Sequence, residues 1–247
     1  MYFGKKIAVV IPAHNEAEYL LETLGHLPPW VDFIVVVDDG SRDNTGTLIK
    51  KFCDSRLHHC QHVNQRGVGH AVMTGYRKVI SLAADIVVTL DADGQMNVGH
   101  LRSMIRPIVS GKCDYTKGNR LYRPKVLKKM PLLRLTGNIF FSLMTMLASG
   151  CWNIWDSQSG YTAMDARLLK KISFSKIFGH YGFYNDLLIE LRSLEARIQN
   201  VPVRTIYRNE KSDVRVWRDA PRIFWLLVSR LVRRVYHESV SMPAQTY

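Results

Sequence analysis

Short apolar runs alternate with helical patterns along the first 95 residues. Each run is rich in Val and Ile and ends in polar or Gly-containing residues, which is typical of buried strands. Such strands are predicted at 7–12, 33–37 and 85–90, with a shorter one inside 53–62. Helices are predicted between them, at 15–27, at 45–52 and from a Gly-rich turn at 64–71 to about Ser81. This alternation predicts an α/β fold with a mostly parallel central sheet flanked by helices.

Two further helices are predicted in the second half. The first, 131–148, is apolar with Arg134 near its start, so it either packs in the core or seats its apolar face in a bilayer. The second, 222–237, has aliphatic and aromatic residues on one side and arginines on the other, at 222, 230, 233 and 234. This pattern is typical of a helix lying flat on an anionic membrane surface, although a terminal helix docked on its own domain explains it too.

The predicted organisation is a folded domain at 1–219 followed by a basic, amphipathic, membrane-associating segment at 220–247. No run reaches the roughly 18 apolar residues of a membrane span, so the attachment is expected to be peripheral. The apolar run after Lys5 and Lys6 is too short for a signal peptide.

Composition fits one large domain in a reducing compartment. The chain has 247 residues, 47% of them apolar, and its four cysteines are too sparse for a disulfide framework. The Cys and His residues inside 53–62 match no closed zinc pattern. The net charge of +13 lies wholly after residue 110, because the first 110 residues hold 11 of the 34 Lys and Arg and 11 of the 21 Asp and Glu. The second half is therefore expected to face something anionic: nucleic acid, a membrane surface or a phosphorylated substrate.

Two carboxylates follow the strand at 85–90. Asp91 and Asp93 share one face of an extended backbone, with the small Ala92 between them, and paired carboxylates suit Mg²⁺ or Mn²⁺. A turn at Gly94 would bring the side-chain oxygen of Gln95 back as a third ligand. A cation held by so few protein ligands keeps open positions for a substrate pyrophosphate, whereas the alternative is an ordinary polar turn.

Other loops at strand ends carry acceptors or glycines. Asp38 and Asp39 end the second strand, where open α/β sheets bind ligands, and their carboxylates can accept hydrogen bonds from a ribose or a base. Asp43 and Asn44 are expected to cap the next helix instead. The Gly-rich turn at 64–71 offers backbone N–H groups to a phosphate.

Taken in order, these motifs resemble family 2 glycosyltransferases of GT-A fold. They are Val-Ile-Pro-Ala-His-Asn-Glu at 10–16, Val-Asp-Asp-Gly-Ser at 37–41, the Gly-rich turn at 64–71 and Leu-Asp-Ala-Asp-Gly-Gln at 90–95. Further matches at 117–120, 156–161 and 210–212 are similar to the polyprenyl-phosphate (dolichyl-phosphate) sugar synthase branch. His70 departs from the pattern, since many relatives have a small residue there, and the C-terminal transmembrane helices of some relatives are missing.

The resemblance implies roles for particular residues. The nucleotide sugar would be bound by Pro12, Ala13, Asn15, Glu16, Asp38, Asp39, Gly67, Asp91 and Ala92, and the cation by Asp91, Asp93 and Gln95. The acceptor phosphate would be bound by Arg120, Arg134 and Asn138, and the catalytic residues would be Asp93, Arg120 and Asp156. Surface charge is the better interpretation of Lys125, Lys128 and Lys129.

The implied function is inverting, metal-dependent transfer of a sugar from a UDP- or GDP-sugar to a polyprenyl or dolichyl phosphate at the cytoplasmic face of a membrane. If the acceptor were instead a glycan hydroxyl, Asp156 or Asp186 would act as general base. Asp186 and Glu190, one helical turn apart, also fit a solvated helix face. A sugar nucleotidyltransferase or a nucleic-acid-binding protein would share single features, but the first strand lacks a Gly-rich loop and no nucleic-acid-binding motif accompanies the charge. The sugar, the base and the oligomeric state stay open.

Overall fold

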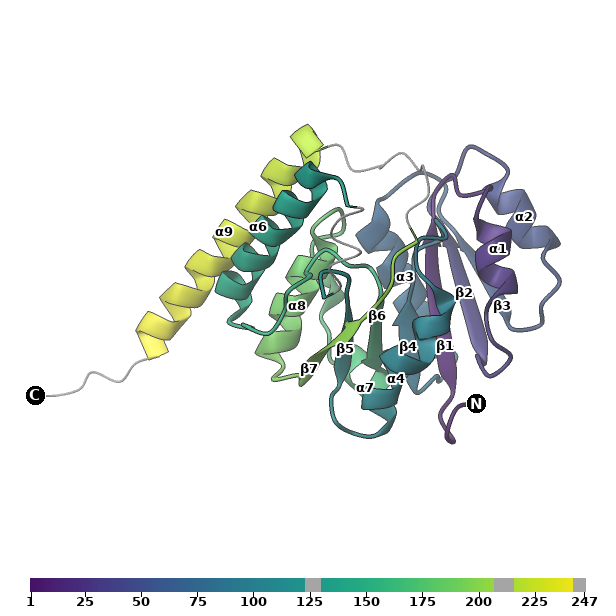
Figure 1. Ribbon diagram of the computed structural model, residues 1–247, viewed down its shortest axis with the longest axis horizontal. Coiled ribbons are helices and arrows are strands. Elements are labelled where there is room, and N and C mark those ends of the chain that lie inside the picture. The colour runs from purple at the N-terminus through teal and green to yellow at the C-terminus, as the bar shows by residue number, and fades with distance from the viewer. Residues whose placement is uncertain (123–129, 207–215, 242–247) are drawn as a thin grey trace, which may run out of the picture.

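A seven-stranded mixed sheet forms the centre of the protein. The computed structural model describes residues 1–122, 130–206 and 216–241. The strand order is β3-β2-β1-β4-β6-β5-β7, and helices cover both faces of the sheet (Figure 1). The strands are β1 Ile7–Ala13, β2 Phe33–Asp38, β3 Leu57–Gln61, β4 Ile86–Thr89, β5 Tyr115–Asn119, β6 Thr162–Asp165 and β7 Ile198–Pro202. The predicted α/β architecture is confirmed.

Strands β1 to β4 are parallel, and their side chains alternate between two apolar clusters. Ile7, Val9 and Ile11 pack with residues of α1 (Leu20–Gly25), α2 (Thr45–Lys51) and α4 (Leu101–Val109). Ala8 and Val10 face α3 (Val68–Ser81), α7 (Ala166–Leu169) and α8 (Phe183–Ser193) on the other side. Because β1 is buried on both faces, its sequence reads as a continuous apolar run.

The first predicted helix, 15–27, is wrong in its extent, since α1 begins only at Leu20. Asn15 takes a left-handed φ of 56°, which interrupts a helix. Its side-chain oxygen accepts from the Arg42 amide, and the Glu16 amide donates to Thr45 Oγ1, so the turn is tied to the loop after β2. In that loop Asp43, rather than Asn44, accepts the Thr45 amide at the start of α2.

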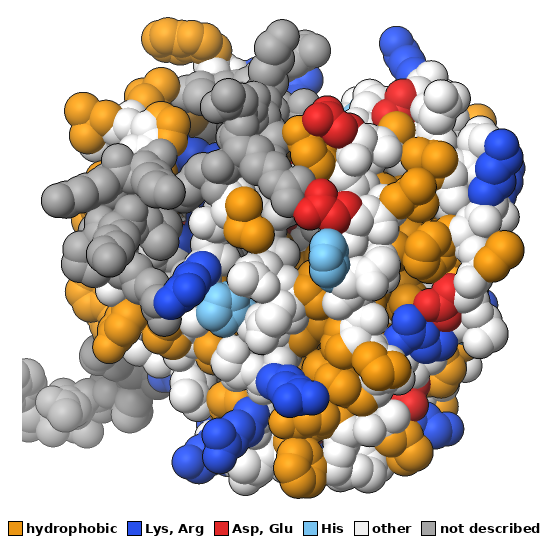
Figure 2. Space-filling view, turned by 45° about the vertical axis from the view of Figure 1, so that its right-hand side comes forward, with side chains coloured by type: hydrophobic (Ala, Val, Ile, Leu, Met, Phe, Trp, Pro, Cys, Tyr) orange, Lys and Arg blue, Asp and Glu red, His pale blue; other side chains and the backbone are white. Residues whose placement is uncertain are grey.

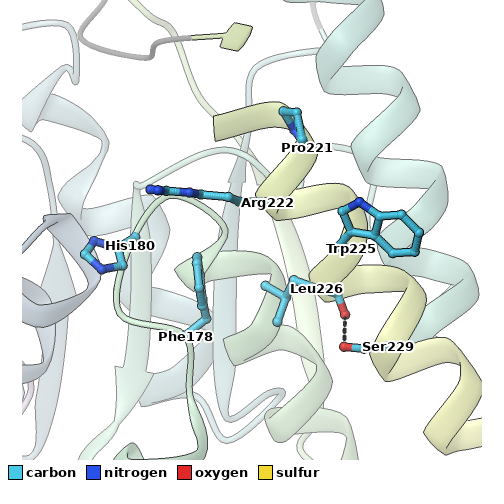
Figure 3. A pocket seen from close by; sticks show the side chains of 7 residues that line it. All are labelled: Phe178, His180, Pro221, Arg222, Trp225, Leu226 and Ser229. Atoms are coloured by element: carbon cyan, nitrogen blue, oxygen red, sulfur yellow. Dashed lines mark hydrogen bonds between the residues drawn. The ribbon is translucent and has the colours of Figure 1, made fainter. Parts of the chain in front are cut away.

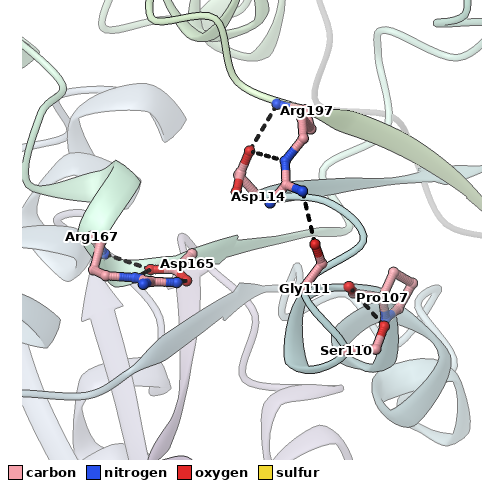
Figure 4. Close-up of polar contacts among 7 residues, drawn as sticks. All are labelled: Pro107, Ser110, Gly111, Asp114, Asp165, Arg167 and Arg197. Atoms are coloured by element: carbon pink, nitrogen blue, oxygen red, sulfur yellow. Dashed lines mark hydrogen bonds and ion pairs between the residues drawn. The ribbon is translucent and has the colours of Figure 1, made fainter.

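Strand β6 runs antiparallel between β4 and β5. It therefore begins at the edge of the sheet where β4 and β5 end, and the segment entering β6 lies beside the segments leaving those two strands. At the opposite edge the Asp114 carboxylate holds the start of β7, accepting from the amide and guanidinium of Arg197, and Asp165 accepts from Arg167 in the same way (Figure 4).

Two long helices, α6 (Leu132–Ser149) and α9 (Val216–Ser241), lie side by side at one end of the molecule (Figure 1). Ile223 and Leu227 of α9 are buried with Ala148 of α6. The predicted boundary between 219 and 220 falls inside α9, so no break in the chain's structure marks it. Figure 2 turns forward the side of the molecule that lies away from these two helices. Acidic and basic side chains are interspersed on it.

The expectation that no segment is long and apolar enough for a membrane span is wrong for α6. This helix has 18 residues with a mean hydropathy of 1.3, so by length and composition alone it could cross a membrane. In the protein 33% of it is buried. Several of its polar residues face inward: Ser142 Oγ contacts Ser157 Oγ at 3.2 Å, and Thr145 Oγ1 accepts from Asn185 Nδ2 at 2.7 Å. One side of α6 is therefore fixed to the domain by hydrogen bonds.

The arginines of α9 do not form one free polar face as predicted. Arg230 donates to both oxygens of Asp186, at 2.7 and 2.9 Å, and Arg234 donates to the Leu147 carbonyl at 3.0 Å. These two residues attach α9 to the domain, whereas Arg222 and Arg233 are exposed. Asp186 itself is 2% exposed, so the prediction that it lies on a solvated helix face is wrong.

Candidate active site

Asp91 and Asp93 lie in the turn that follows β4, at the edge of the sheet where β6 begins. Gly94 takes a φ of 69°, and the Gln95 amide turns back to donate to Asp93 Oδ1 at 2.9 Å. A Cβ atom on Gly160 would lie 2.7 Å from Asp91 Oδ2, so a side chain there would force this carboxylate to shift. The Gln95 carbonyl accepts from the Ile206 amide, which fixes the far side of the turn.

The two carboxylates sit in an environment that disfavours their charges. Burial, and next to it the charge of Asp93, raises the pKa of Asp91 to about 7, and burial also raises the pKa of Asp93. Within the described part of the chain, no three or more His, Cys, Asp and Glu side chains gather as a metal site. Two half-buried like charges, with no third anion beside them among the described residues, fit a divalent cation that takes its other ligands from Gln95, water or substrate oxygens.

We expect divalent-cation binding to weaken as pH falls below about 7. A cation binds the ionised form of Asp91, whose raised pKa means that a proton occupies it in the metal-free protein at lower pH. With one proton displaced per cation, the affinity should fall about tenfold per pH unit below pH 7. Calorimetric titration with Mn²⁺ at pH 8, 7 and 6 measures this, and equal affinities at pH 8 and 6 would contradict the assignment of Asp91.

Arg120, directly after β5, and Asp156, in the segment entering β6, form a buried ion pair. The guanidinium donates through Nε and Nη2 to the two carboxylate oxygens, both at 2.8 Å, and the Arg120 amide adds a bond of 3.0 Å to Oδ2. Asp156 is fully buried and Arg120 is 8% exposed. Burial alone would raise the pKa of Asp156, but the charge and hydrogen bonds of Arg120 outweigh it and hold that pKa below its usual value.

Lys117 of β5 is a site residue that the sequence analysis did not single out. Its side chain is fully buried, its Nζ has no hydrogen-bond partner among the described residues, and it lies 4.5 Å from the centre of the Tyr184 ring. Burial lowers the pKa of Lys117 to about 7, although the charges of Asp156 and Asp91 oppose the shift. In the sequence, the signal that could have identified it is a lysine inside a strand whose other residues are buried.

Of the residues predicted to bind the acceptor phosphate, the structure brings Arg120 and Arg134 near Asp91 and Asp93 but directs Asn138 elsewhere. Arg134, half-buried near the start of α6, is close enough to Asp91 and Asp93 for its charge to lower their pKa values, as is Arg120. Asn138 is buried one turn later, and its amide points to the Met130 sulfur at 3.7 Å. Lys125, Lys128, Lys129 and the motif at 210–212 lie outside the described residues.

Asp38 and Asp39 are brought to the predicted nucleotide side, but protein groups occupy their carboxylates. Asp38 Oδ1 accepts from the Ser41 amide at 2.9 Å. Asp39 accepts from the amides of Arg66 and Gly67, at 2.9 and 2.7 Å. The prediction that the Gly-rich turn offers these N–H groups to a phosphate is therefore wrong for Arg66 and Gly67, because Asp39 supplies the anion.

The end of β1 closes this side of the site. The Ala13 carbonyl accepts from the Asp39 amide at 2.8 Å, and the Asn15 amide donates to Ser41 Oγ at 3.0 Å. Pro12 and Ala13 are buried, and Ala92, between Asp91 and Asp93, is 1% exposed. The structure thus gathers most of the predicted nucleotide-sugar residues at one edge of the sheet; their contacts with a nucleotide stay a prediction.

A known family has this arrangement of motifs, and the comparison of sequences identifies it. The family model described as Glycosyl transferase family 2 matches residues 8–173, more than half of the chain. The chain belongs to glycosyl transferase family 2. It is therefore a glycosyltransferase, as the sequence motifs predicted.

Relatives within the family act on lipid phosphates according to their names. The chain is 34% identical over 218 residues to UDP-N-acetylglucosamine--dolichyl-phosphate N-acetylglucosaminyltransferase of Methanococcus voltae. This match covers 82% of this chain and 86% of the relative. It is 29% identical over 208 residues to undecaprenyl-phosphate mannosyltransferase of Micrococcus luteus, covering 82% and 84%. The polyprenyl-phosphate branch predicted for this glycosyltransferase is thus confirmed as the group it resembles.

The fold of the glycosyltransferase matches a solved structure of glucosyl-3-phosphoglycerate synthase from Mycobacterium tuberculosis in complex with Mn²⁺, UDP and phosphoglyceric acid. The TM-score is 0.71 at 20% identity, and the match covers 98% of this chain and 81% of that one. Another structure of the same enzyme holds Mg²⁺ and UDP. The match confirms the predicted GT-A fold.

Asp186 does not take part in the candidate active site of this glycosyltransferase. Both its oxygens accept from Arg230, and Oδ2 also accepts from the Phe178 amide at 2.8 Å. Phe178 lines a groove of about 580 Å³ between α9 and the segment before α8, together with His180, Arg222 and Trp225 (Figure 3). None of the predicted site residues lines this groove.

Proposed function

We propose that this glycosyltransferase transfers a sugar from a nucleotide sugar to a polyprenyl or dolichyl phosphate. The observation that supports this acceptor most directly is the Arg120–Asp156 pair. Both oxygens of Asp156 accept from one guanidinium, and its pKa is held low, so Asp156 is a poor base for a hydroxyl acceptor. The relatives from Methanococcus voltae and Micrococcus luteus, named for dolichyl and undecaprenyl phosphate, support the same class of acceptor.

A phosphate acceptor needs no base. A phosphomonoester carries about 1.5 to 2 negative charges near neutral pH, so its oxygen is already a nucleophile. Such an anion also needs cationic partners near the reacting centre, and Arg134 and Arg120 lie close enough to Asp91 and Asp93 to influence their pKa values. Guanidinium groups suit phosphate oxygens because they donate two parallel hydrogen bonds.

The proposed reaction is a single displacement. An acceptor phosphate oxygen forms a bond to the anomeric carbon, and the bond from that carbon to the nucleoside diphosphate breaks, its electron pair leaving with the diphosphate. No proton is transferred, and the anomeric configuration inverts. Asp91, Asp93 and Gln95 would hold Mg²⁺ or Mn²⁺, which as a Lewis acid neutralises the charge of the departing diphosphate. Arg134 would bind the acceptor phosphate, while Asp156 orients Arg120 toward it.

A paired acceptor assay tests the proposal. UDP-glucose, UDP-N-acetylglucosamine and GDP-mannose are each incubated with Mg²⁺ or Mn²⁺ and either a short polyprenyl phosphate or the matching polyprenol. Release of UDP or GDP only with the phosphate, together with a sugar-phosphate-lipid product, is the expected result. Transfer to the polyprenol at a similar rate would favour a hydroxyl acceptor, and release of pyrophosphate would indicate a nucleotidyltransferase.

We place this reaction at the cytoplasmic face of a membrane, with the protein attached peripherally by α6 and α9 together. Large apolar side chains are exposed on the outer sides of both helices, where Phe140 of α6 stacks on Phe224 of α9 at 6.4 Å. They are Leu132, Leu133, Ile139, Phe140, Leu143 and Leu147 on α6, and Trp217, Trp225, Val232, Val235 and Tyr236 on α9. Exposed arginines 218, 222 and 233 on α9 would add attraction to anionic lipid.

Replacing exposed apolar residues on both helices should release the protein from membranes without unfolding it. Leu143 is 48% exposed and Trp225 is 67% exposed, so the double variant Leu143→Ser and Trp225→Ser removes little of the core. Burying these two side chains in lipid would contribute about 3 to 6 kcal/mol, so their loss should reduce binding at least about 100-fold. Flotation with vesicles containing anionic lipid measures this, and Leu21→Ser on α1, where Leu21 is 41% exposed, is the matched control. Equal flotation of both variants and the unmodified protein would contradict attachment by α6 and α9.

A further inference from the structure

A buried imidazole joins three elements next to the loops assigned to the nucleotide. His62 follows β3 directly and is 8% exposed. Its Nδ1 lies 2.6 Å from Asp39 Oδ1, after β2, and its Nε2 lies 2.9 Å from Thr74 Oγ1 of α3. Because an ionised carboxylate only accepts hydrogen bonds, Nδ1 donates to Asp39. Both ring nitrogens are used, so the ring has one orientation between β2 and α3.

The Asp39 carboxylate, in turn, determines the conformation of the turn at 64–67. Oδ1 also accepts from the Arg66 amide and Oδ2 from the Gly67 amide. Gly67 has a φ of 103°, and a Cβ atom there would lie 2.5 Å from His180 Nδ1. Gly40, with a φ of 68°, lets the loop after β2 approach the Gln65 amide just as closely. The two loops therefore fit together in one arrangement, and Asp39 makes the side-chain contacts between them.

We propose that His62 is a positioning residue for nucleotide binding. It does not touch the substrate; it fixes Asp39, and through Asp39 it holds the 38–41 and 64–67 loops in the arrangement that binds the nucleotide. This inference rests on the proposed function, and it takes from the sequence the assignment of Asp38, Asp39 and Gly67 to the nucleotide sugar. Without His62, Asp39 loses its only side-chain donor among the described residues and the turn samples other conformations. The apparent affinity for the nucleotide is then the intrinsic affinity multiplied by the fraction of molecules whose loops keep the binding arrangement.

Nucleotide binding to three variants tests the proposal. His62→Leu keeps the volume and removes both hydrogen bonds, His62→Gln keeps an amide that can donate to Asp39, and His58→Leu is the control. His58 is on the same strand, but its ring packs near Phe33 instead. In calorimetric titrations with UDP and GDP in the presence of Mn²⁺, His62→Leu should bind about tenfold more weakly, His62→Gln within about threefold of the unmodified protein, and His58→Leu equally well.

Steady-state kinetics distinguish positioning from general damage. His62→Leu should raise KM for the sugar nucleotide by about the same tenfold factor and leave kcat and the KM for lipid phosphate unchanged. Once the nucleotide is bound, the loops are in the correct arrangement and the enzyme reacts at its normal rate. A matching fall in kcat, or equal rises in both KM values, would overturn the assignment. So would unchanged nucleotide affinity in His62→Leu.

Hydrogen exchange separates a failure of this inference from a failure of the proposed function. The Arg66 and Gly67 amides that bond to Asp39 should exchange faster in ligand-free His62→Leu than in the unmodified protein or His58→Leu. If no protein form binds UDP or GDP, the proposed function fails, and the exchange rates alone then show whether His62 positions the turn. If His62→Leu does not fold, Thr74→Val, which removes only the contact to Nε2, should show a smaller change in the same direction; no change would overturn the proposal.

Discussion

Asp91→Asn and Asp93→Asn are each expected to reduce sugar transfer about 1,000-fold while leaving the protein folded. Each variant removes one of two carboxylates that would hold the cation, and a cation's stabilisation of a departing diphosphate amounts to several kcal/mol, where each 1.4 kcal/mol is tenfold in rate. The fold should survive because the substitution removes a charge from a half-buried pair in which burial raises both pKa values and the charge of Asp93 raises that of Asp91 further. The metal-free variants should be at least as stable as the unmodified protein at pH 8.

The matched control is Asp114→Asn. Asp114 is on the same sheet, before β5, but it holds Arg197 at the opposite edge (Figure 4). Release of UDP or GDP, Mn²⁺ titration and thermal unfolding are measured on all three variants. Full turnover by the unmodified protein in EDTA, or normal Mn²⁺ affinity in Asp91→Asn, would show that these carboxylates do not hold the cation.

Arg120→Met and Arg134→Ala are expected to fail in different ways, although the sequence assigned both arginines to the same phosphate. Removing the Arg120 guanidinium leaves Asp156 fully buried without its ion-pair partner, which should lower the free energy of unfolding by about 3 to 5 kcal/mol. Arg134 is half-buried with no ion pair to a described residue, so Arg134→Ala should leave stability nearly unchanged. It should raise KM for the lipid phosphate at least about 30-fold, a loss of about 2 kcal/mol, with little change for the sugar nucleotide.

A double variant isolates the ion pair. Arg120→Met combined with Asp156→Leu removes both charges and should recover most of the lost stability without recovering transfer. Denaturant unfolding and separate KM measurements for the two substrates check these expectations. If Arg120→Met is as stable as the unmodified protein, or if Arg134→Ala raises both KM values equally, the assigned roles are wrong.

Truncation after Asp219 is a poor test of membrane attachment. The sequence pattern of α9 suggested a removable segment, because periodicity shows which residues share a side of a helix but not what that side contacts. In the structure Ile223 and Leu227 are buried, and Arg230 neutralises the buried Asp186. Deleting α9 would expose these groups, so loss of membrane binding could follow from unfolding. Point substitutions on the exposed side avoid this difficulty.

The strands, their parallel order in the first half and the motif-bearing loops could be predicted because they depend on local patterns. Runs such as 7–13 and 33–38 are apolar throughout since both faces of the sheet are covered. The partners of buried polar groups could not be predicted, because they depend on contacts across the fold. Asp39 is paired with residues 23 to 28 positions away, and Asp156 with Arg120, 36 positions away. His62 was missed for the same reason.

The antiparallel course of β6 has a consequence for how this chain can change. Since β5 ends and β6 begins at the same edge of the sheet, the whole stretch between them, including α6, is an excursion that leaves and returns at neighbouring points. Such an excursion can be exchanged without altering the register of any strand, provided that the contacts of α6 with α8 and α9 are kept. The segment that would choose the acceptor thus lies apart, along the chain, from the loops that would hold the nucleotide. Chimeric proteins that exchange only this excursion would inherit the donor preference of one parent and the acceptor preference of the other.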